Sequence, residues 1–209
     1  AAVVTALVRA HRKLGFDRAR ARDLNWLVTT ERIPAHPPQH VQDQYFEFLR
    51  HLGVDPEPVE WNLGPWPHER ERAEAAWAGV PRPAAVLVIG ASKPEKEWLP
   101  ERWAALCDGL AERYGLTPVL AGGRSPRELA TEAEVLRLAR HPVVSTLGAP
   151  LRDMVALLAG ARLTVSLDTG PLHMSVAVGT PVVALMGHLN PKRVGPYRRF
   201  RDLLVDAYG

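Results

Sequence analysis

The segment 163–197, LTVSLDTGPLHMSVAVGTPVVALMGHLNPKRVGPY, constrains the fold of this chain more than any other. It begins with a short apolar run rich in β-branched residues, 163–167, which is typical of a buried strand. The turn DTGP follows, and its Pro suits the first position of a helix, which we expect to run over 171–178 and to stop at Gly179. A second apolar strand is predicted over 181–186. This pattern predicts a β-α-β unit.

Four residues of this unit fall where ligands bind in such sheets. Asp168, Thr169 and Gly170 directly follow the first strand, and His173 lies in the first turn of the helix. Ligands of open parallel sheets sit at the carboxyl ends of the strands, and a helix amino terminus favours anions. The turn therefore predicts an anion-binding site.

The same alternation of strand and helix extends back to about residue 85. Each apolar run is short, and a longer segment with helical spacing separates it from the next. Such alternation predicts an α/β fold with a doubly wound, Rossmann-like parallel sheet and helices on both faces. The expected strands are 85–89, 117–120 and 142–145, and the expected helices are 100–114, 126–140 and 151–159.

The first eighty residues do not follow this alternation. Helical spacing predicts helices over 1–14 and 41–52, and the run 59–63 indicates an edge strand. Residues 65–80 contain a highly charged helix, whose alternating charges are typical of a solvated face. Because a stiff Pro-Arg-Pro break follows this helix, we place a domain boundary between residues 78 and 79.

Composition limits the classes of function. One cysteine, Cys107, excludes an internal disulfide and a cysteine-based zinc cluster, which fits a reducing cytoplasm. No apolar run approaches the ~18 residues needed to span a bilayer. His36, His40 and His51 lack the spacing of metal ligands, so no metal site is predicted. The net charge of +3 is only mildly basic, and we expect no nucleic-acid partner.

The two ends of the sequence show neither an initiator methionine nor a signal-peptide pattern. The chain opens with AAVVTALVRAHRKLGF and closes with VDAYG, directly after an apolar run. We therefore expect flanking residues beyond both ends, and a cytoplasmic location.

Three loops at strand ends converge if the sheet is doubly wound: 90–96, 122–127 and 168–173. The sequence has neither G-x-G-x-x-G after a strand nor G-x-x-x-x-G-K-S/T, the best-defined signatures of dinucleotide and phosphate binding. The loops carry small residues, hydroxyls and Lys96 instead. That composition suits a phosphate ester held by backbone amides and a point charge.

The chain contains, in this order, the segments GASKPEKEWLPERWAAL, LAGGRSPRE and VSLDTGPLHMSVAVGTPVVALMGHLNPKRVGPY. Their order and spacing resemble the carboxyl-terminal domain of family-nine glycosyltransferases, the lipopolysaccharide heptosyltransferases. The similarity covers roughly residues 41–200. The element D-T-G-x-x-H with its downstream G-P-Y makes the resemblance specific.

The resemblance implies a GT-B fold, in which two Rossmann-like domains face each other and the second holds most of the nucleotide-sugar. Residues 1–78 are then the tail of an amino-terminal acceptor domain and a linker. Residues 79–209 are the donor-binding domain, truncated at its end. The family's proposed general base is an Asp near the start of the acceptor domain, so we expect it outside this sequence.

The resemblance also implies roles for residues of the first two loops. Lys96 matches the family Lys that lies against the donor diphosphate and stabilises the leaving group, with a surface loop Lys as the alternative. Ser92 matches a hydroxyl that reaches the same phosphates. Glu128, or Arg127 beside it, falls where the family contacts the ribose. The dipole of a helix also favours a Glu at its start, which gives the structural alternative for Glu128.

The third loop matches the family motif with Asp168, Thr169 and Gly170. The resemblance implies that the amides of Thr169 and Gly170 bind phosphate. The negatively charged Asp168 is expected to cap the turn, to orient His173 or Lys96, or to accept from the sugar. His173 is implied to donate to a phosphate oxygen, and the alternative is a core histidine bonded to the backbone.

Two positions depart from the family pattern. Val88-Ile89 stands where the family often has His-Pro, so a polar side chain is missing at that strand end. After the last strand of the motif, His188-Leu189 replaces a Pro-Thr pair, so a hydroxyl is missing there too.

The resemblance implies an inverting, metal-independent transfer of a heptose or related sugar from an ADP-sugar such as ADP-heptose to a lipopolysaccharide core acceptor, without a cofactor. No D-x-D cluster for a divalent metal is visible in the sequence. A lipid-linked saccharide acceptor implies peripheral contact with the inner membrane surface, and the Arg-rich segment 9–22 is the candidate for it. The alternatives are an enzyme similar to nucleotide-sugar epimerases and a non-catalytic module that binds a nucleotide-sugar.

Overall fold

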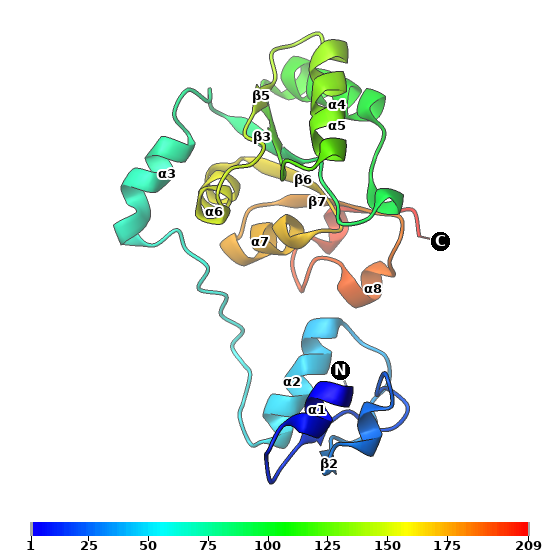
Figure 1. Cartoon of the computed structure of the whole chain (residues 1–209). Helices are drawn as coiled ribbons and strands as arrows, with labels where there is room; N and C mark the ends of the chain where they lie inside the picture. Colours follow the sequence, from blue (N-terminus) through cyan, green and yellow to red (C-terminus); the bar gives the residue numbers. More distant parts are fainter. Residues whose placement is uncertain (1, 209) are drawn as a thin grey trace. The chain divides into compact units, whose positions relative to one another are not determined.

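The computed structural model describes residues 2–208, which fall into two compact units (Figure 1). The first unit extends to Glu60 and the second begins at Trp61. The division therefore lies earlier than the boundary predicted between residues 78 and 79, because the charged helix packs into the second unit. Trp77, which directly follows that helix, is buried in a core cluster with Val86 and Leu158, and its indole donates to the carbonyl of Ala156 over 3.0 Å.

The amino-terminal unit holds three helices and two short parallel strands. The expected first helix over 1–14 ends at Leu7. At Lys13 the backbone is already paired with another segment, since its amide donates to Thr30 Oγ1 over 2.8 Å and its carbonyl accepts from the amide of Thr30. The chain there runs into the first strand instead. The elements are α1 (Ala2–Leu7), β1 (Leu14–Gly15), the 3-10 helix η1 (Asn25–Leu27), β2 (Glu31–Arg32) and α2 (Val41–His51).

The second unit contains one parallel sheet of six strands in the order β5-β4-β3-β6-β7-β8. Chain order reverses between β3 and β6, as in a doubly wound fold, and ligands of such folds bind at this switch point. The strands are β3 (Ala84–Val88), β4 (Thr117–Ala121), β5 (Val144–Ser145), β6 (Leu163–Leu167), β7 (Val182–Met186) and β8 (Leu204–Asp206). The predicted α/β class with a Rossmann-like parallel sheet is confirmed.

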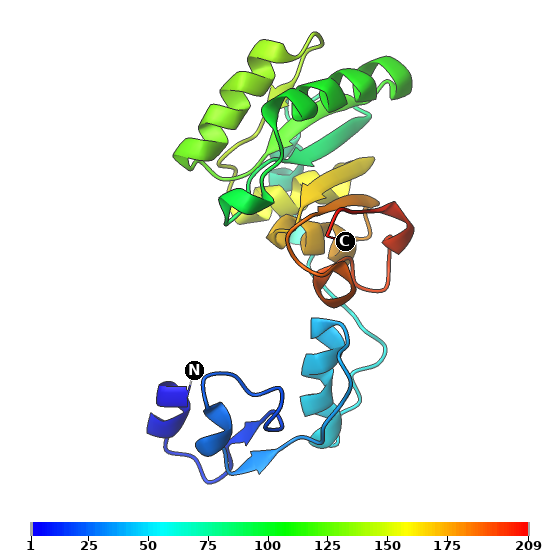
Figure 2. The same ribbon diagram turned by 90° about the vertical axis from the view of Figure 1, so that its right-hand side faces the viewer.

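Helices cover both faces of this sheet (Figures 1 and 2). Alternate residues of β3 point to opposite faces, so that Leu87 packs with α4 and α5, and Val86 packs with α6. Leu172 and Val176 of α7 pack against β7 in a third cluster. The helices are α3 (Arg70–Ala76), α4 (Pro100–Tyr114), α5 (Pro126–Leu138), α6 (Leu151–Gly160), α7 (Gly170–Val178) and α8 (Pro191–Val194), with short 3-10 helices η2 (Pro67–Glu69), η3 (Pro94–Lys96) and η4 (Arg201–Leu203).

The edge strand predicted over 59–63 is absent from the described structure. This backbone is held by side chains rather than by a neighbouring strand. Trp61 packs edge-on against Tyr197 at a centroid distance of 5.9 Å, and the carbonyl of Leu63 accepts from Arg152 over 3.0 Å. Arg152 also pairs with Glu69 and lies over the Trp66 ring. Residues 63–69 are thus held against α6 by the side chain of Arg152.

Among residues 2–208, no helix combines the length and the apolar composition that crossing a membrane requires.

Candidate functional site

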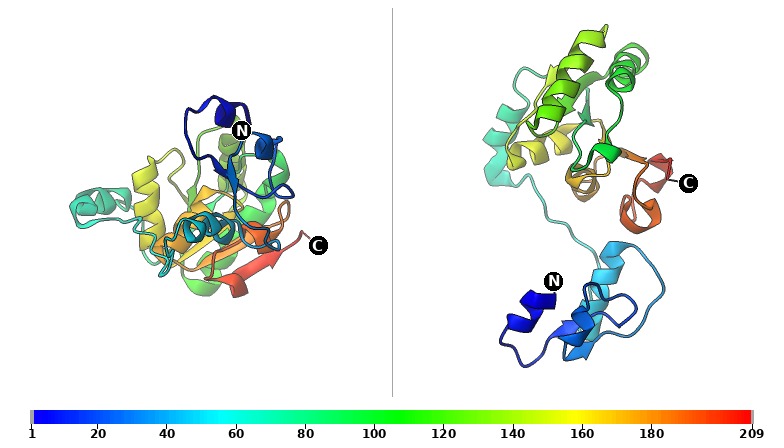
Figure 3. Two further views of the ribbon diagram at one scale, coloured as in Figure 1. Left: turned by 90° about the horizontal axis from the view of Figure 1, so that it is seen from below. Right: turned by 45° about the vertical axis from the view of Figure 1, so that its right-hand side comes forward.

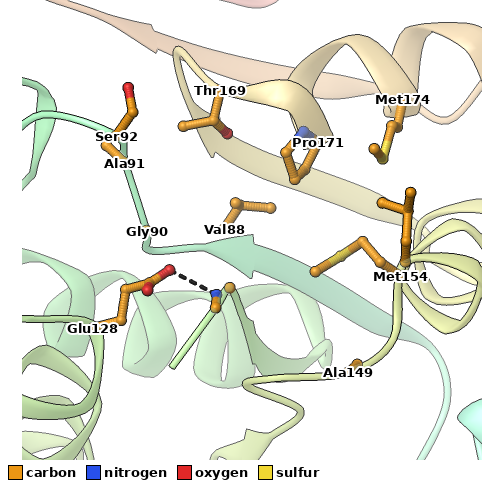
Figure 4. Close-up of a pocket in the computed structure, with 13 residues that line it drawn as sticks. Val88, Gly90, Ala91, Ser92, Glu128, Ala149, Met154, Thr169, Pro171 and Met174 are labelled. Carbon is orange, nitrogen blue, oxygen red and sulfur yellow. Dashed lines mark hydrogen bonds between the residues drawn. The ribbon is translucent and has the colours of Figure 1, made fainter. Parts of the chain in front are cut away.

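A pocket of about 480 Å³ opens at the carboxyl ends of β3, β4 and β6, where the strand order reverses (Figure 4). One part is lined by small residues with Ser92, Glu128 and Thr169, and the other part is apolar. In Figure 4, Met154 and Met174 lie on the other side of Val88 from Glu128. The lining residues are Val88, Gly90, Ala91, Ser92, Gly122, Gly123, Glu128, Ala149, Leu151, Met154, Thr169, Pro171 and Met174.

Glu128 is fixed in the polar part by the loop in front of α5. One carboxylate oxygen accepts from the amide of Gly123 over 2.6 Å, and the other accepts from the amide and the hydroxyl of Ser125 over 2.9 and 2.6 Å. Ser125 returns the contact by accepting from the Glu128 amide, which completes a capping box. Partial burial alone raises the pKa of Glu128, but these hydrogen bonds outweigh it and hold the pKa below its ordinary value. Glu128 is therefore a preorganised anion.

The Glu128 carboxylate, where its hydrogen bonds hold it, leaves no room for a side chain at Gly90 or Gly123. A Cβ on Gly90 would lie 1.9 Å from Glu128 Oε1, and a Cβ on Gly123 would lie 2.8 Å from Glu128 Oε2. The carboxylate thus covers the end of β3 and the loop after β4. A single acidic side chain joins the two strand ends on one side of the switch point.

Lys96 and Asp168 form an ion pair beside the pocket. Lys96 Nζ donates to Asp168 Oδ2 over 2.6 Å and to the Asp168 carbonyl over 3.1 Å. The two side chains are only 11% and 9% exposed. Of the alternatives for Asp168, the structure places it against Lys96, whereas the N-cap of α7 is Thr169, without a side-chain cap bond. The pair joins the loop after β3 to the turn after β6.

The remaining residues of the DTG motif surround the start of α7. Thr169 and Pro171 line the pocket, so the amino terminus of α7 lies at its wall. The Thr169 hydroxyl is buried and has no hydrogen-bond partner in the described structure. Gly170 begins the helix and His173 lies in its first turn. Among the described residues that line the pocket, Gly170, His173, Lys96 and Asp168 do not appear.

Arg127 does not line the pocket. Its Nε lies 3.0 Å from Glu97 Oε1, and its terminal nitrogen donates to the carbonyl of Ala91 over 3.4 Å. Of the two candidates for a ribose contact, only Glu128 lines the pocket. Arg127 instead ties the loop after β3 to the start of α5.

The apolar part of the pocket was not predicted. Met154 is buried on α6 and Met174 is half-buried on α7, and both read in the sequence as ordinary core positions of amphipathic helices. Only the folded structure brings them together beside Val88. No group of three His, Cys, Asp or Glu side chains in the described part of the chain is arranged to hold a metal ion.

Comparison with known proteins identifies the family. The family model for glycosyltransferase family 9 (heptosyltransferase) matches residues 1–205. The chain belongs to this family. The predicted resemblance is thereby confirmed, and it extends over more of the chain than the expected residues 41–200.

Curated members of family 9 match over most of this chain. The lipopolysaccharide core heptosyltransferase OpsX of Haemophilus influenzae is 27% identical over 209 residues, which is 100% of this chain and 59% of that protein. The lipopolysaccharide heptosyltransferase 1 of Salmonella typhimurium is 31% identical over 201 residues, which is 94% of this chain and 60% of that protein. The chain thus spans about three fifths of the length of these relatives.

Solved structures of family 9 confirm the GT-B type of fold. A family 9 glycosyltransferase from Veillonella parvula superposes with a TM-score of 0.78 at 25% identity, over 98% of this chain and 58% of that one. The E. coli heptosyltransferase WaaC with ADP superposes with a TM-score of 0.66 at 24% identity, over 91% and 57% of the two chains. The six-stranded sheet is therefore a family 9 domain.

Proposed function

We propose that this protein transfers a heptose or related sugar from an ADP-sugar to a lipopolysaccharide core acceptor, with inversion at the anomeric carbon and without a metal ion. The observation that carries the proposal is the pocket at the switch point, which joins a fixed carboxylate, an apolar wall and the amino terminus of α7. The family supports glycosyl transfer, because the named relatives are lipopolysaccharide heptosyltransferases.

The two parts of the pocket match the two parts of a nucleoside. The Glu128 carboxylate accepts three hydrogen bonds from the protein and retains acceptor capacity, which suits the hydroxyl groups of a ribose. The apolar part around Met154 and Met174 suits a flat heteroaromatic base, since methionine sulfur packs favourably on aromatic rings. A volume of about 480 Å³ falls within the usual range for cofactor-sized ligands.

The diphosphate is proposed to lie between Ser92 and the start of α7. Thr169 lies at this wall, and its hydroxyl has no hydrogen-bond partner in the described structure. The helix amino terminus supplies partial positive charge. Lys96 stands beside this wall and exchanges part of its contact with Asp168 for the phosphate, so that Asp168 holds the ammonium in place before the donor binds.

In the proposed reaction an acceptor hydroxyl oxygen attacks the anomeric carbon of the donor. The bond from that carbon to the diphosphate oxygen breaks, and ADP departs with the electron pair. Lys96 and the amino terminus of α7 stabilise the charge that grows on ADP. The proton of the acceptor passes to a general base of the acceptor domain, outside this sequence.

Two solved relatives support an ADP-sugar donor. The WaaC structures contain ADP in one case and ADP-2-deoxy-2-fluoro heptose in the other. The acceptor is proposed to be a lipid-linked saccharide, as the names of the relatives suggest. With such an acceptor, the proposed site of action is the inner face of the cytoplasmic membrane.

Calorimetric titration of ADP, UDP and GDP into the full-length protein tests the donor. ADP is expected to bind most tightly, and Lys96→Ala is expected to weaken ADP binding roughly 10- to 100-fold, the worth of one charge-assisted contact. The matched control is Lys93→Ala, which removes an exposed cation from the same loop and should leave the affinity unchanged. Equal affinity for all three nucleotides, or an equal effect of the two substitutions, would contradict the proposal.

A further inference from the structure

The loop after β3 carries Ser92 and Lys96, two of the residues that the proposed function assigns to the diphosphate. It covers residues 89–99, between the end of β3 and the start of α4. Residues 92–95 are exposed, and the backbone hydrogen bonds of η3, at 3.1 and 3.0 Å, join residues of the loop to one another. The position of Lys96 therefore depends on contacts that side chains make near the two ends of the loop.

Arg127, at the start of α5, contacts this loop at both ends. Its Nε lies 3.0 Å from Glu97 Oε1, and a terminal nitrogen donates to the carbonyl of Ala91 over 3.4 Å. These are the positions directly before Ser92 and directly after Lys96. The loop and the start of α5 can be followed in the right-hand view of Figure 3, in green and yellow-green. One planar guanidinium thus spans the part of the loop that carries both proposed phosphate ligands.

The contact with Glu97 is partly shielded from water. Glu97 Oε1 is buried and accepts no hydrogen bond in the described structure, so its charge is balanced by the Arg127 cation at 3.0 Å. A carboxylate oxygen that is removed from water without a cation costs free energy. Loss of Arg127 would therefore favour movement of Glu97 toward solvent, and this movement would carry the neighbouring Lys96 with it.

Arg127 is itself held in a fixed part of the fold. It follows Pro126 in the first turn of α5 and precedes Glu128, whose carboxylate is bonded to the loop in front of the helix. Farther along the same helix, Val135 is fully buried in the core. Arg127 therefore connects an anchored helix start to an exposed loop.

A second contact holds the loop in the ligand-free protein. Lys96 Nζ donates to Asp168 Oδ2 over 2.6 Å and to the Asp168 carbonyl over 3.1 Å. In the proposed function Lys96 exchanges part of this contact for a phosphate oxygen. The two contacts of Arg127 do not take part in that exchange, so they gain importance for the position of the loop when the donor binds.

We propose that Arg127 is a positioning residue for Lys96, which it holds beside the diphosphate site through the two ends of the loop. This role rests on the proposed function, in which Lys96 binds the diphosphate. Arg127 does not belong to the described residues that line the pocket. Its effect on donor binding is therefore transmitted through the loop and not by contact with the donor.

Calorimetric titration of ADP into the full-length protein tests this role. Arg127→Met keeps the length of the side chain and removes its charge, and it should weaken ADP binding about fivefold, the size that a partly exposed ion pair can contribute. Glu97→Gln should produce a similar loss, and Arg127→Lys should bind ADP more tightly than Arg127→Met. The matched control is Arg137→Met, which breaks the ion pair with Glu134 on the same helix and should leave ADP affinity unchanged.

Combination with Lys96→Ala distinguishes positioning from general destabilisation. Once Lys96 is absent, Arg127→Met should weaken ADP binding less than twofold further, because the two residues act on one contact. A purely structural effect would lower the affinity by the same factor in both backgrounds. The Tm of the ligand-free protein gives a second readout. Arg127→Met and Arg137→Met should have similar Tm values, since Asp168 still holds Lys96 in the absence of donor.

The positioning role and the donor proposal fail in different ways. If Lys96→Ala weakens ADP binding and Arg127→Met does not, the positioning role is wrong and the donor proposal stands. If Lys96→Ala has no effect on ADP binding, the assignment of Lys96 to the diphosphate is wrong, and the positioning role falls with it. Equal effects of Arg127→Met and Arg137→Met, or full additivity of Arg127→Met with Lys96→Ala, would also overturn the positioning role.

Discussion

Glu128→Gln separates the role of the carboxylate from the role of the side-chain shape. Glutamine is isosteric with glutamate but presents one acceptor oxygen and one NH₂ donor. The loop before α5 directs only donors at this group, from Gly123 and from Ser125. Whichever way the amide turns, its NH₂ group faces at least one N–H donor at close range.

The cost of this substitution can be estimated from the contacts. If the amide oxygen keeps both Ser125 donors, the bond from the Gly123 amide is lost and the other two lose their charge assistance. Hydrogen bonds to a charged group contribute roughly 1.5–3 kcal/mol each, and partial exposure lowers this, so we expect a loss of about 2 kcal/mol in the free energy of unfolding. For a protein of this size, that corresponds to a decrease of about 4–8 °C in Tm.

Thermal and urea unfolding, followed by tryptophan fluorescence and circular dichroism, measure this loss. The control is Glu134→Gln on the same helix, whose exposed ion pair with Arg137 is expected to contribute less than about 0.5 kcal/mol. If the two variants unfold at the same midpoint, the Glu128 carboxylate does not hold the loop, and the proposed preorganisation of the ribose end is wrong.

Three further predictions concern the second unit. Gly90→Ala should destabilise the protein because its Cβ would lie 1.9 Å from Glu128 Oε1, and urea unfolding should show a smaller cost when Glu128→Ala is combined with it. Hydrogen bonds from Arg152 lower the pKa of Glu69 from 4.5 to about 2, so this contribution to stability should be complete above about pH 4.5 and lost as the pH falls toward 2. Acid titration of Arg152→Met should lack that dependence, and an unchanged profile would refute the pairing. Burial raises the pKa of Cys107 to about 12, so an aromatic disulfide reagent at pH 8 should modify it only after unfolding; rapid modification of the native protein would contradict this.

The fold of the second unit was largely predictable from sequence. Local signals set the ends of α4, where Pro100 occupies the first turn and Gly115 adopts a φ of 61° beyond the last. Long-range contacts decided the exceptions. The helix predicted over 126–140 ends at Leu138, because the side chain of Asp108 accepts from the backbone amides of Arg140 and His141. No local pattern reveals a cap from thirty residues away.

The candidate site was predictable where it depends on loops at strand ends. Ser92, Glu128 and Thr169 line one pocket, as convergence of parallel strands requires. The partnership of Lys96 with Asp168 was one of several alternatives, since a sequence shows which charges are near an edge and not which of them pair. Met154 and Met174 were not recognised as site residues, because their positions on α6 and α7 have the spacing of ordinary core residues.

The contact between Glu128 and Gly90 has a consequence for sequence change in related chains. A side chain at position 90 would displace the Glu128 carboxylate from its hydrogen bonds to Gly123 and Ser125, so position 90 accepts a side chain at lower cost once position 128 has lost its long acid. The two positions, thirty-eight residues apart in the printed sequence, should therefore vary together, and a chain with alanine at the first should lack glutamate at the second. Glycine at position 90 together with glutamate at position 128 should therefore identify, from sequence alone, related chains whose pocket contains the same carboxylate.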